Sequence, residues 1–439
     1  MEINTESFYN ESDYMDNNIH ENSNYGRWAI ILMFLSTILQ TYFGFARDAS
    51  PLFKLFIAAF CWGSVFCSIR MIRDLASYSL VAKATLYTLF GILTLSITRP
   101  LLGGSAVVGN KYVVLFTNMY TALDLVGIFL ITSIKAAHEI RLLLKTTILL
   151  IFISTILLVF KYNIMVTSYS LTYICIFAPI FIPYIGYRKK NILLIGMALA
   201  FFTYYGGGRQ AAFILGIALI SLVSSKLYGH FINYILSIVI MLIPFFAIAY
   251  SLKHGSIFDI ASNSINVGDT FQIENENVNS DTRTFLWIEL FNDFFQQDIW
   301  TQLFGKGAIA YYSSNFFRTN YRLGIEVPIL QWLLQCGLIF IIAYTTIAVL
   351  AINRLYRYGN NRLCKIASIL IAGFYCNCYV SNLVGCSIMQ LGFWFLVSIA
   401  FNNSLLQATD DDILGVLSYD EDFIEQENED NEQQEDNNC

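Results

Sequence analysis

FINYILSIVIMLIPFFAIAYSL, residues Phe231–Leu252, is the stretch that decides the fold of this chain. It contains no Asp, Glu, Lys or Arg, and an apolar helix of about 20 residues is long enough to cross the hydrocarbon core of a bilayer. Similar runs recur along the 439 residues, of which 56% are hydrophobic and 13% charged. A transmembrane β-barrel would show segments of about ten residues with alternating polarity. The sequence therefore predicts an all-α, polytopic integral membrane protein.

The apolar runs predict about twelve transmembrane helices. They are expected at Trp28–Ala46, Pro51–Ile69, Leu80–Thr98, Tyr112–Ile134, Thr146–Phe160, Ser168–Tyr187, Asn191–Tyr205, Gln210–Ser225, Phe231–Leu252, Gly324–Asn353, Cys364–Asn382 and Leu383–Asn402.

Basic residues are distributed unevenly over the connections between these helices. Fifteen Lys and Arg, counting Arg27, fall on one side, and only six fall in the short loops on the other side. Because loops rich in Lys and Arg stay in the cytoplasm, both termini are predicted to be cytoplasmic.

The two ends of the chain are acidic. Residues 1–27 hold six Asp and Glu, and residues 409–439 hold thirteen with no Lys or Arg. Such segments bury too little apolar surface to offset the entropy lost on ordering. We expect a disordered acidic cytoplasmic N-terminal tail at 1–27, a transmembrane helical domain at 28–403, and a disordered acidic cytoplasmic C-terminal tail at 404–439.

The longest connection, residues 253–323 between the ninth and tenth helices, is predicted to be a large extracytoplasmic loop. Connections of this length are usually functional or disordered. Within it, TFLWIELFNDFF at Thr284–Phe295 places apolar side chains on one face of a helix. That pattern favours an interfacial helix held by its aromatic residues, a platform for sugars, or both.

Arg209 follows three glycines, Gly206 to Gly208, at the start of a predicted outer helix. Glycines let backbone amides approach a ligand, and the positive end of the helix dipole points to the same place. A guanidinium group there is typical of a phosphate site, although an arginine that snorkels to the membrane surface is the alternative. Arg283, Arg318 and Arg322 favour the phosphate site because they could gather at the same face; for Arg318 simple solvation is also possible.

Three acidic or titratable residues are further candidates. Glu326 stands near the outer mouth of the tenth helix, where partial burial could raise its pKa toward that of a working base; the helix dipole alone also favours a Glu there. His254 could act as a base, but a lone loop histidine is often inert. Asp124 falls within the fourth predicted span, which indicates either a functional carboxylate or a buried pair that fixes packing.

Several site types have no counterpart in the sequence. No two histidines have metal-ligand spacing, and neither a nucleotide-binding glycine turn nor a nucleophile elbow occurs. We therefore expect no metal and no cofactor. Eight of the nine cysteines lie in apolar segments, which argues against disulfides. An inner or plasma membrane suits this composition.

Two parts of the chain resemble the O-antigen polymerase and O-antigen ligase family (Wzy-type). The first is Gly208-Arg209-Gln210-Ala211 at a helix start; the second runs from Arg283 and Trp287 through LFGKG (303–307) to Glu326 and Gly337. Many relatives carry a His-Asn pair eleven residues before that glycine, whereas this chain has Glu326 and Val327. The difference argues against the ligase branch.

The resemblance implies a glycosyltransferase of the bacterial inner (plasma) membrane that joins polyprenyl-pyrophosphate-linked oligosaccharide repeats of an O-antigen, capsule or exopolysaccharide. A hydroxyl of one repeat would attack the anomeric carbon of the growing chain, and pyrophosphate would leave. Arg209, Arg283 and Arg322 would stabilise its growing charge. Glu326 would take the acceptor proton, with Asp281 or His254 as substitutes.

The remaining residues of the implied substrate site are Arg318, Trp287 and Gly208. The implied partners are the lipid-linked oligosaccharide, membrane lipid and a chain-length regulator, with no nucleic acid. Three alternatives stay open: a ligase-type transferase, a flippase or other secondary transporter, to which twelve helices are well suited, and a lipid-phosphosugar glycosyltransferase. The last usually has acids in its first outer loop, where this chain offers only Asp48.

Overall fold

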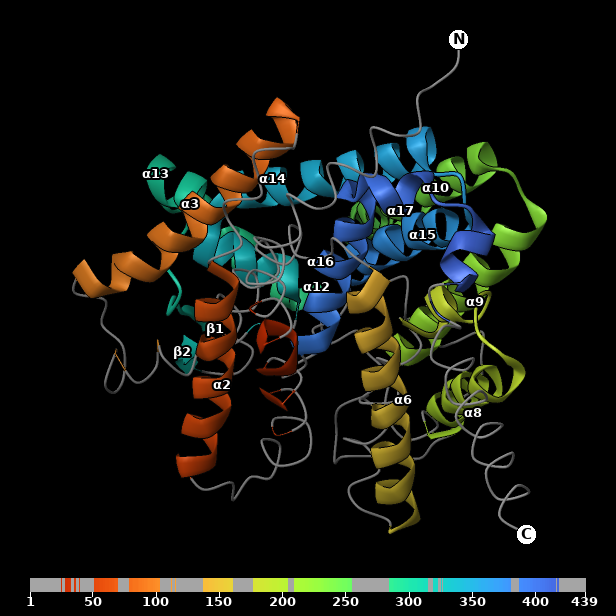
Figure 1. Ribbon diagram of the computed structural model, residues 1–439. Coiled ribbons are helices and arrows are strands. Elements are labelled where there is room, and N and C mark those ends of the chain that lie inside the picture. Colours follow the sequence, from red (N-terminus) through yellow and green to blue (C-terminus); the bar gives the residue numbers. More distant parts are fainter. Residues whose placement is uncertain are drawn as a thin grey trace, which may run out of the picture.

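The structure is a computed structural model (Figure 1). It describes residues 25, 28–32, 35–36, 39, 51–69, 79–102, 112, 115, 137–160, 177–203, 209–254, 284–314, 319–322, 325, 327–379, 387–415 and 417.

The N-terminal part of the described chain is a series of apolar helices. They are α2 (Pro51–Ile69), α3 (Leu80–Leu102), α6 (Ala137–Val159), α8 (Tyr187–Thr203), α9 (Arg209–Leu227) and α10 (His230–His254). The bounds of α2 are those predicted. α6 begins at Ala137 rather than Thr146, because the intervening stretch contains no Gly or Pro and Leu142–Leu144 favour a helix.

The predicted helix Ser168–Tyr187 is interrupted. Residues 177–181 are helical, and the chain then turns before α8 begins. Pro183 has no backbone N–H to continue a helix, and Gly186 disfavours one. The basic residues Arg188–Lys190, predicted to lie in a loop, therefore belong to the first turn of α8.

The C-terminal part begins with short elements of the predicted outer loop. They are α12 (Thr284–Phe295), with the bounds predicted, α13 (Ile299–Phe304), β1 (Tyr312–Ser314) and β2 (Thr319–Arg322). β1 and β2 pair antiparallel. This hairpin is a small departure from the all-α prediction, because strands of three and four residues are too short to show a period.

Four helices follow this hairpin, and the first of them, α14, is the longest helix of the described chain. They are α14 (Pro328–Tyr358), α15 (Arg362–Asn377), α16 (Ser387–Phe401) and α17 (Asn403–Gln407).

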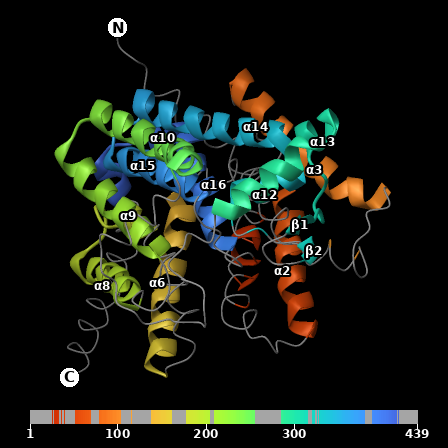
Figure 2. The ribbon, with the colours of Figure 1, turned by 180° about the vertical axis from the view of Figure 1, so that it is seen from behind.

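The core of the described structure is built around α15. This helix packs against α9, α10, α14 and α16, and α3 packs against α14. Figures 1 and 2 show α10, α14 and α15 close together, with α12 and α13 toward one end of α14. Every residue from Ile366 to Asn377 is buried. A helix that is covered all round in this way belongs to the interior of a bundle.

Aromatic rings fill the space between α14 and α16. The ring of Tyr344 lies 4.6 Å from the ring of Trp332 and 4.5 Å from that of Phe393, measured between centroids. Such pairs contribute about 0.5–1.5 kcal/mol beyond the area they bury.

Three helices of the described chain are long and apolar enough to cross a membrane. They are Leu80–Leu102, His230–Tyr250 and Pro328–Tyr358, and shorter apolar helices accompany them. The chain is thus strongly helical and has the character of a membrane protein. The count of twelve spans stays a prediction, in part because most of the predicted first and fourth helices lies outside the described residues.

The beginning of the predicted C-terminal tail is packed rather than disordered. Leu405 and Leu406 are 8% and 1% exposed, and the Asn361 side-chain amide donates to the carbonyl oxygens of Leu405 and Ala408 at 2.8 and 2.9 Å. The Tyr184 hydroxyl donates to Asp410 Oδ1 at 2.6 Å. The prediction placed the start of the tail too early. It relied on the average composition of the segment, which is acidic, whereas a few leucines there bury enough apolar surface to pack against the helical domain.

Candidate functional site

The C-terminal end of α15 is a point where several elements with predicted site residues meet. In the first turn of α14, the Ile329 N–H donates to the carbonyl oxygen of Cys378 at 3.1 Å. In α12, the indole ring of Trp287 stacks on the ring of Tyr379, with centroids 6.2 Å apart and planes 5° from parallel. The start of α14 and one face of α12 therefore lie against the residues that end α15.

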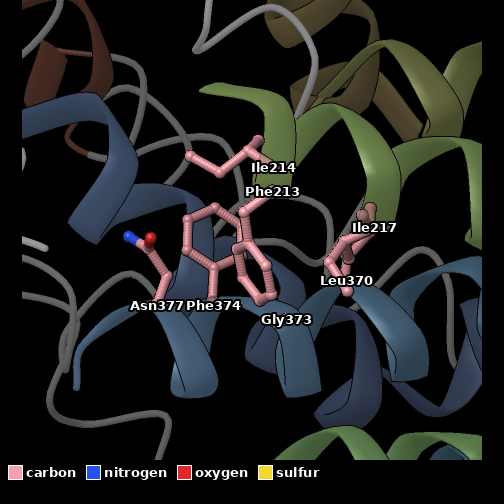
Figure 3. A pocket seen from close by; sticks show the side chains of 7 residues that line it. All are labelled: Phe213, Ile214, Ile217, Leu370, Gly373, Phe374 and Asn377. Carbon is pink, nitrogen blue, oxygen red and sulfur yellow. The ribbon is translucent and has the colours of Figure 1, made fainter. Parts of the chain in front are cut away.

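The start of α9 and the last turns of α10 reach the same place. Phe213, one turn into α9, lines a hollow together with Asn377 (Figure 3). The ring of Phe245 in α10 lies 5.2 Å from the ring of Tyr379, and α10 continues beyond this level to His254. Four helices thus converge on the end of α15.

Hydroxyl groups hold the ring of Tyr379 in position. The hydroxyls of Tyr379 and Tyr375 are hydrogen-bonded at 2.8 Å, and the Tyr375 hydroxyl is hydrogen-bonded to Thr345 Oγ1 at 2.8 Å. Linked hydrogen bonds in a buried site strengthen one another. α14 and α15 together therefore fix the ring against which Trp287 lies.

The start of α14 is anchored by its own side chains. The Ile325 N–H donates to Gln331 Oε1 at 2.8 Å, and Pro328 is the first helical residue, where a missing N–H is tolerated. Ile325 and Val327 are 2% and 0% exposed. Glu326, the predicted base, stands between them in the sequence and lies outside the described residues.

α14 is broken at Gly337, whose φ of 77° and ψ of −175° are not helical. The LFGKG loop (303–307) fills the break. Its Lys306 N–H donates to the carbonyl oxygen of Leu334 at 2.8 Å, and its Gly307 N–H donates to the carbonyl oxygen of Gln335 at 3.0 Å. Carbonyl oxygens beside a helix break need donors from elsewhere, and here the loop supplies them.

Glycine is required on both sides of this contact. Gly305 has φ 74° and ψ 175°, a region of backbone conformation that is essentially confined to glycine, and Gly337 shares it. A Cβ on Gly305 would lie 2.3 Å from the carbonyl group of Gln335, and one on Gly337 would lie 2.4 Å from the carbonyl oxygen of Leu303. The two backbones are therefore in direct contact.

The end of α3 closes the contact from a third side. The Ser96 hydroxyl donates to the Gln335 carbonyl oxygen at 3.1 Å, and the Ser96 carbonyl oxygen accepts from the Ala308 N–H at 2.8 Å. The Gln335 side-chain amide donates to the Ala308 carbonyl oxygen at 2.8 Å. The Arg99 guanidinium donates to the Gly305 carbonyl oxygen. Hydrogen bonds thus join the loop, α3 and α14.

An ion pair joins α12 to the LFGKG loop beside a small hollow between α12, α13 and α14. Lys306 Nζ is 2.6 Å from Asp293 Oδ2, and the two side chains are 24% and 26% exposed. Gln297 and Thr301 also line the hollow. These polar groups bind one another: the Gln297 side-chain amide donates to the Asp293 carbonyl oxygen at 3.1 Å.

Asp298 fixes the start of α13. Its carboxylate accepts hydrogen bonds from the Thr301 hydroxyl at 2.7 Å, the Thr301 N–H at 3.1 Å and the Trp300 N–H at 3.0 Å. These hydrogen bonds, led by the one from the Thr301 hydroxyl, favour the charged form and hold the pKa of Asp298 below its usual value.

The structure positions four of the predicted site residues at least by their backbone. Arg209 is the first residue of α9, His254 is the last of α10, and Trp287 lies in α12. Arg322 is the last residue of β2 and pairs with Tyr312 of β1. The remaining predicted residues lie outside the described residues: Gly208, Asp281, Arg283, Arg318, Glu326 and Asp124.

Sequence reasoning missed three groups that the structure brings into the site. Gln335 links α14 to the loop, Asp293 pairs with Lys306, and Asn377 lines the hollow at the end of α15. A polar side chain inside an apolar segment is costly, and that signal could have pointed to Gln335 and Asn377. Asp293 had no such signal, because its partner is distant in the sequence.

Within the described ranges, no group of three His, Cys, Asp or Glu side chains is arranged to hold a metal ion. Comparison of the chain with protein-family models, with curated proteins and with solved structures gave no match.

Proposed function

We propose that this chain is a polysaccharide polymerase, a membrane glycosyltransferase that joins polyprenyl-pyrophosphate-linked oligosaccharide repeats on the outer face of a bacterial inner membrane. The observation that supports it is the convergence of α9, α12 and α14 on the end of α15. Arg209 stands four residues before Phe213, and Arg283 stands four residues before Trp287. Phe213 and Trp287 each lie against the end of α15, so α9 and α12 meet there, and the proposal gives the two arginines a role at this place.

The chemistry of the proposal needs cations more than an acid. A hydroxyl oxygen of one repeat forms the new bond to the anomeric carbon of the growing chain, and the bond from that carbon to the pyrophosphate oxygen breaks. Pyrophosphate leaves as an anion, so Arg209, Arg283 and Arg322 have the role of stabilising its charge. Glu326 receives the proton of the attacking hydroxyl. In this proposal both termini of the chain lie in the cytoplasm.

The test uses purified full-length protein and a synthetic lipid-linked repeat, without nucleotide sugar or metal. A ladder of longer products is the expected result. Arg209→Gln and Arg283→Gln should each lower the rate about 100-fold or more, the loss typical of one charge-stabilising donor. Glu326→Gln should lower it by about 100-fold or more, as loss of a general base does.

The matched control is Arg188→Gln, which removes an exposed arginine from the first turn of α8. It should leave the ladder unchanged. Long products from both the Arg209 and Arg283 variants would refute the roles given to those residues. Single additions to an unrelated acceptor, with no ladder, would instead identify a ligase-type transferase.

A second candidate, a flippase or other secondary transporter, is favoured by the broken helix α14, because transporters often bind cargo at discontinuous helices. Here, however, the chain's own loop occupies the backbone groups that the break exposes. Movement of the lipid-linked repeat from one leaflet of a vesicle membrane to the other, without new covalent products, would support this candidate over the polymerase.

A further inference from the structure

One end of the helix bundle is rich in Lys and Arg. Its basic residues lie in three stretches: residues 187–190 at the start of α8, residues 226–230 at the turn from α9 to α10, and residues 357–365 at the turn from α14 to α15. Together the three stretches hold seven Lys and Arg and no Asp or Glu. We call the surface that they form the basic end.

Hydrogen bonds show that the three stretches are neighbours. The Leu363 N–H donates to the hydroxyl of Tyr184, three residues before α8, at 2.7 Å. Lys365 Nζ donates to the carbonyl oxygen of Tyr228 at 3.2 Å. The start of α15 therefore lies between the start of α8 and the turn from α9 to α10, so residues that are far apart in the sequence share this surface.

Acidic residues of the described chain neutralise only part of this charge. Residues 410–412, in the docked segment after α17, are three aspartates. Arg362 Nε lies 3.7 Å from Asp410 Oδ2, and the Arg362 N–H donates to Asp410 Oδ1 at 2.8 Å. Even with all three aspartates counted, the basic residues outnumber the acidic ones by four, so the basic end keeps a positive charge.

Four exposed side chains of the basic end have no hydrogen-bond or ion-pair partner among the residues that the structure describes. They are Arg188, Lys190, Lys226 and Arg357. Two of them stand in the first turn of α8, which contains no acidic residue, and the helix dipole disfavours cations at that position. An anion from outside the chain would relieve this repulsion.

The ends of two long apolar helices set the depth of this surface. Of the helices that are long and apolar enough to cross a membrane, His230–Tyr250 begins in the basic end and Pro328–Tyr358 finishes in it. The ring of Tyr234 stacks on that of Tyr356 with centroids 4.6 Å apart, so the two helix ends lie side by side. Residues at the end of a membrane-crossing helix lie among the lipid head groups.

Exposed aromatic rings accompany the basic residues. Tyr187, Tyr228 and Tyr358 are 79%, 47% and 54% exposed, and Phe231 is 60% exposed. Tyrosine is enriched where a membrane meets water, because its ring is apolar and its hydroxyl is polar. Cations mixed with exposed rings fit a layer of lipid head groups, whereas a soluble anion would make no use of the rings.

We infer that the basic end binds the phosphate head groups of anionic phospholipids in the membrane, with Arg188, Lys190, Lys226 and Arg357 as the contacting cations. This inference does not depend on the proposed glycosyltransferase activity. Each Lys or Arg near an anionic membrane surface raises the affinity about fivefold. Because one head group contacts one or two of these cations, an anionic lipid should be preferred over a zwitterionic one by about 5-fold to 25-fold.

The test is photo-crosslinking of the purified full-length protein in nanodiscs of phosphatidylcholine. The discs contain a trace of either phosphatidylglycerol or phosphatidylcholine that carries a diazirine next to the glycerol and an alkyne at the end of one chain, and mass spectrometry locates the label. At low salt, peptides from the three stretches should carry about 5 to 25 times more label from phosphatidylglycerol. At about 1 M salt this preference should largely disappear, because exposed charges are then screened within about 3 Å.

A quadruple variant tests the four cations together. Replacing each of them with Gln, as Arg188→Gln, Lys190→Gln, Lys226→Gln and Arg357→Gln, should abolish the preference for phosphatidylglycerol. All four side chains are exposed, so the melting temperature of the variant in pure phosphatidylcholine discs should match that of the wild type. The control is Lys83→Gln, in α3 and outside the three stretches, which should keep the preference.

Equal labelling by the two lipids in the wild type would overturn the inference. That result is expected if the chain's own acidic residues between 420 and 436 neutralise the basic end instead. A preference that persists in the quadruple variant would also overturn it, as would loss of the label on addition of water-soluble glycerophosphoglycerol, which would identify a site for soluble phosphodiesters. The expected preference in a protein that forms no polymer would leave the inference intact and count against the proposed function alone.

Discussion

Replacing either glycine at the contact between the LFGKG loop and α14 should strongly destabilise the protein. In Gly305→Ala the new Cβ would lie 2.3 Å from the backbone carbonyl group of Gln335, and in Gly337→Ala it would lie 2.4 Å from the carbonyl oxygen of Leu303. A non-glycine residue in this φ/ψ region costs about 1–3 kcal/mol, and overpacking adds about 1–3 kcal/mol. Because backbone rather than a flexible side chain must move, the sum of about 2–6 kcal/mol applies.

The assay is thermal unfolding of the detergent-solubilised protein, followed by fluorescence-detected size exclusion. At about 2 °C per kcal/mol, the melting temperature should fall by about 4–12 °C in each variant. Gly216→Ala in α9 is the matched control, because nothing lies within 4 Å of its added Cβ. Removing a helical glycine there should leave stability unchanged or raise it by up to about 1 kcal/mol. If Gly305→Ala and Gly337→Ala melt together with Gly216→Ala, the backbone contact is not as described.

Three further predictions concern the ends of helices and one ion pair. A double-mutant cycle on Lys306→Met and Asp293→Asn, read by the same thermal assay, should give a coupling free energy of about 1 kcal/mol. This is the upper end for exposed ion pairs, because both side chains are largely covered. Additive effects of the two mutations would contradict the prediction. Asp298 has a lowered pKa, so its contribution to stability is present above the usual aspartate pKa and is lost as pH falls through the lowered value. Asp298→Asn should remove that acid-side loss from the stability profile, and an unchanged profile would count against the cap. Asn361→Ala should lower the free energy of unfolding by about 1–2 kcal/mol, because the N-cap of α15 is lost. It should also speed limited proteolysis within residues 403–415, with the cleavage sites located by mass spectrometry. Protection equal to that of the wild type would show that Asn361 does not hold this segment.

Local patterns were enough to predict some elements completely. α2 and α12 have the predicted bounds, because an uninterrupted apolar run and a one-sided apolar face are both properties of neighbouring residues. The break in α14 was not predictable in this way. A glycine inside an apolar run is compatible with a continuous helix, and the groups that stabilise the break come from Lys306 and Gly307, far from Gly337 in the sequence.

The residue types of the candidate site stay a prediction, and its centre was not predicted. The sequence suggested that Arg209, Arg283, Arg318 and Arg322 gather at one face. The structure brings α12 and the start of α9 to the end of α15. Tyr379 and Asn377 form that centre. The polar side chain of Asn377 inside an apolar segment was a signal, whereas no local pattern marked Tyr379. A ring stack between Trp287 and Tyr379 joins residues that are distant in sequence, so only the fold reveals it.

The break at Gly337 also determines which part of α14 has the length needed to cross a bilayer. As one helix, its 31 residues would measure about 46 Å, well above the hydrocarbon thickness of about 30 Å. Divided at Gly337, it becomes a piece of about 13 Å, Pro328–Cys336, and a piece of about 31 Å, Leu338–Tyr358. Only the second piece matches the thickness of a bilayer. The first piece folds back beside it, because the ring of Trp332 lies 4.6 Å from that of Tyr344 and the Ile329 N–H reaches the carbonyl oxygen of Cys378. A hydropathy profile that treats Pro328–Tyr358 as a single span would therefore count the first piece as part of the membrane-crossing length.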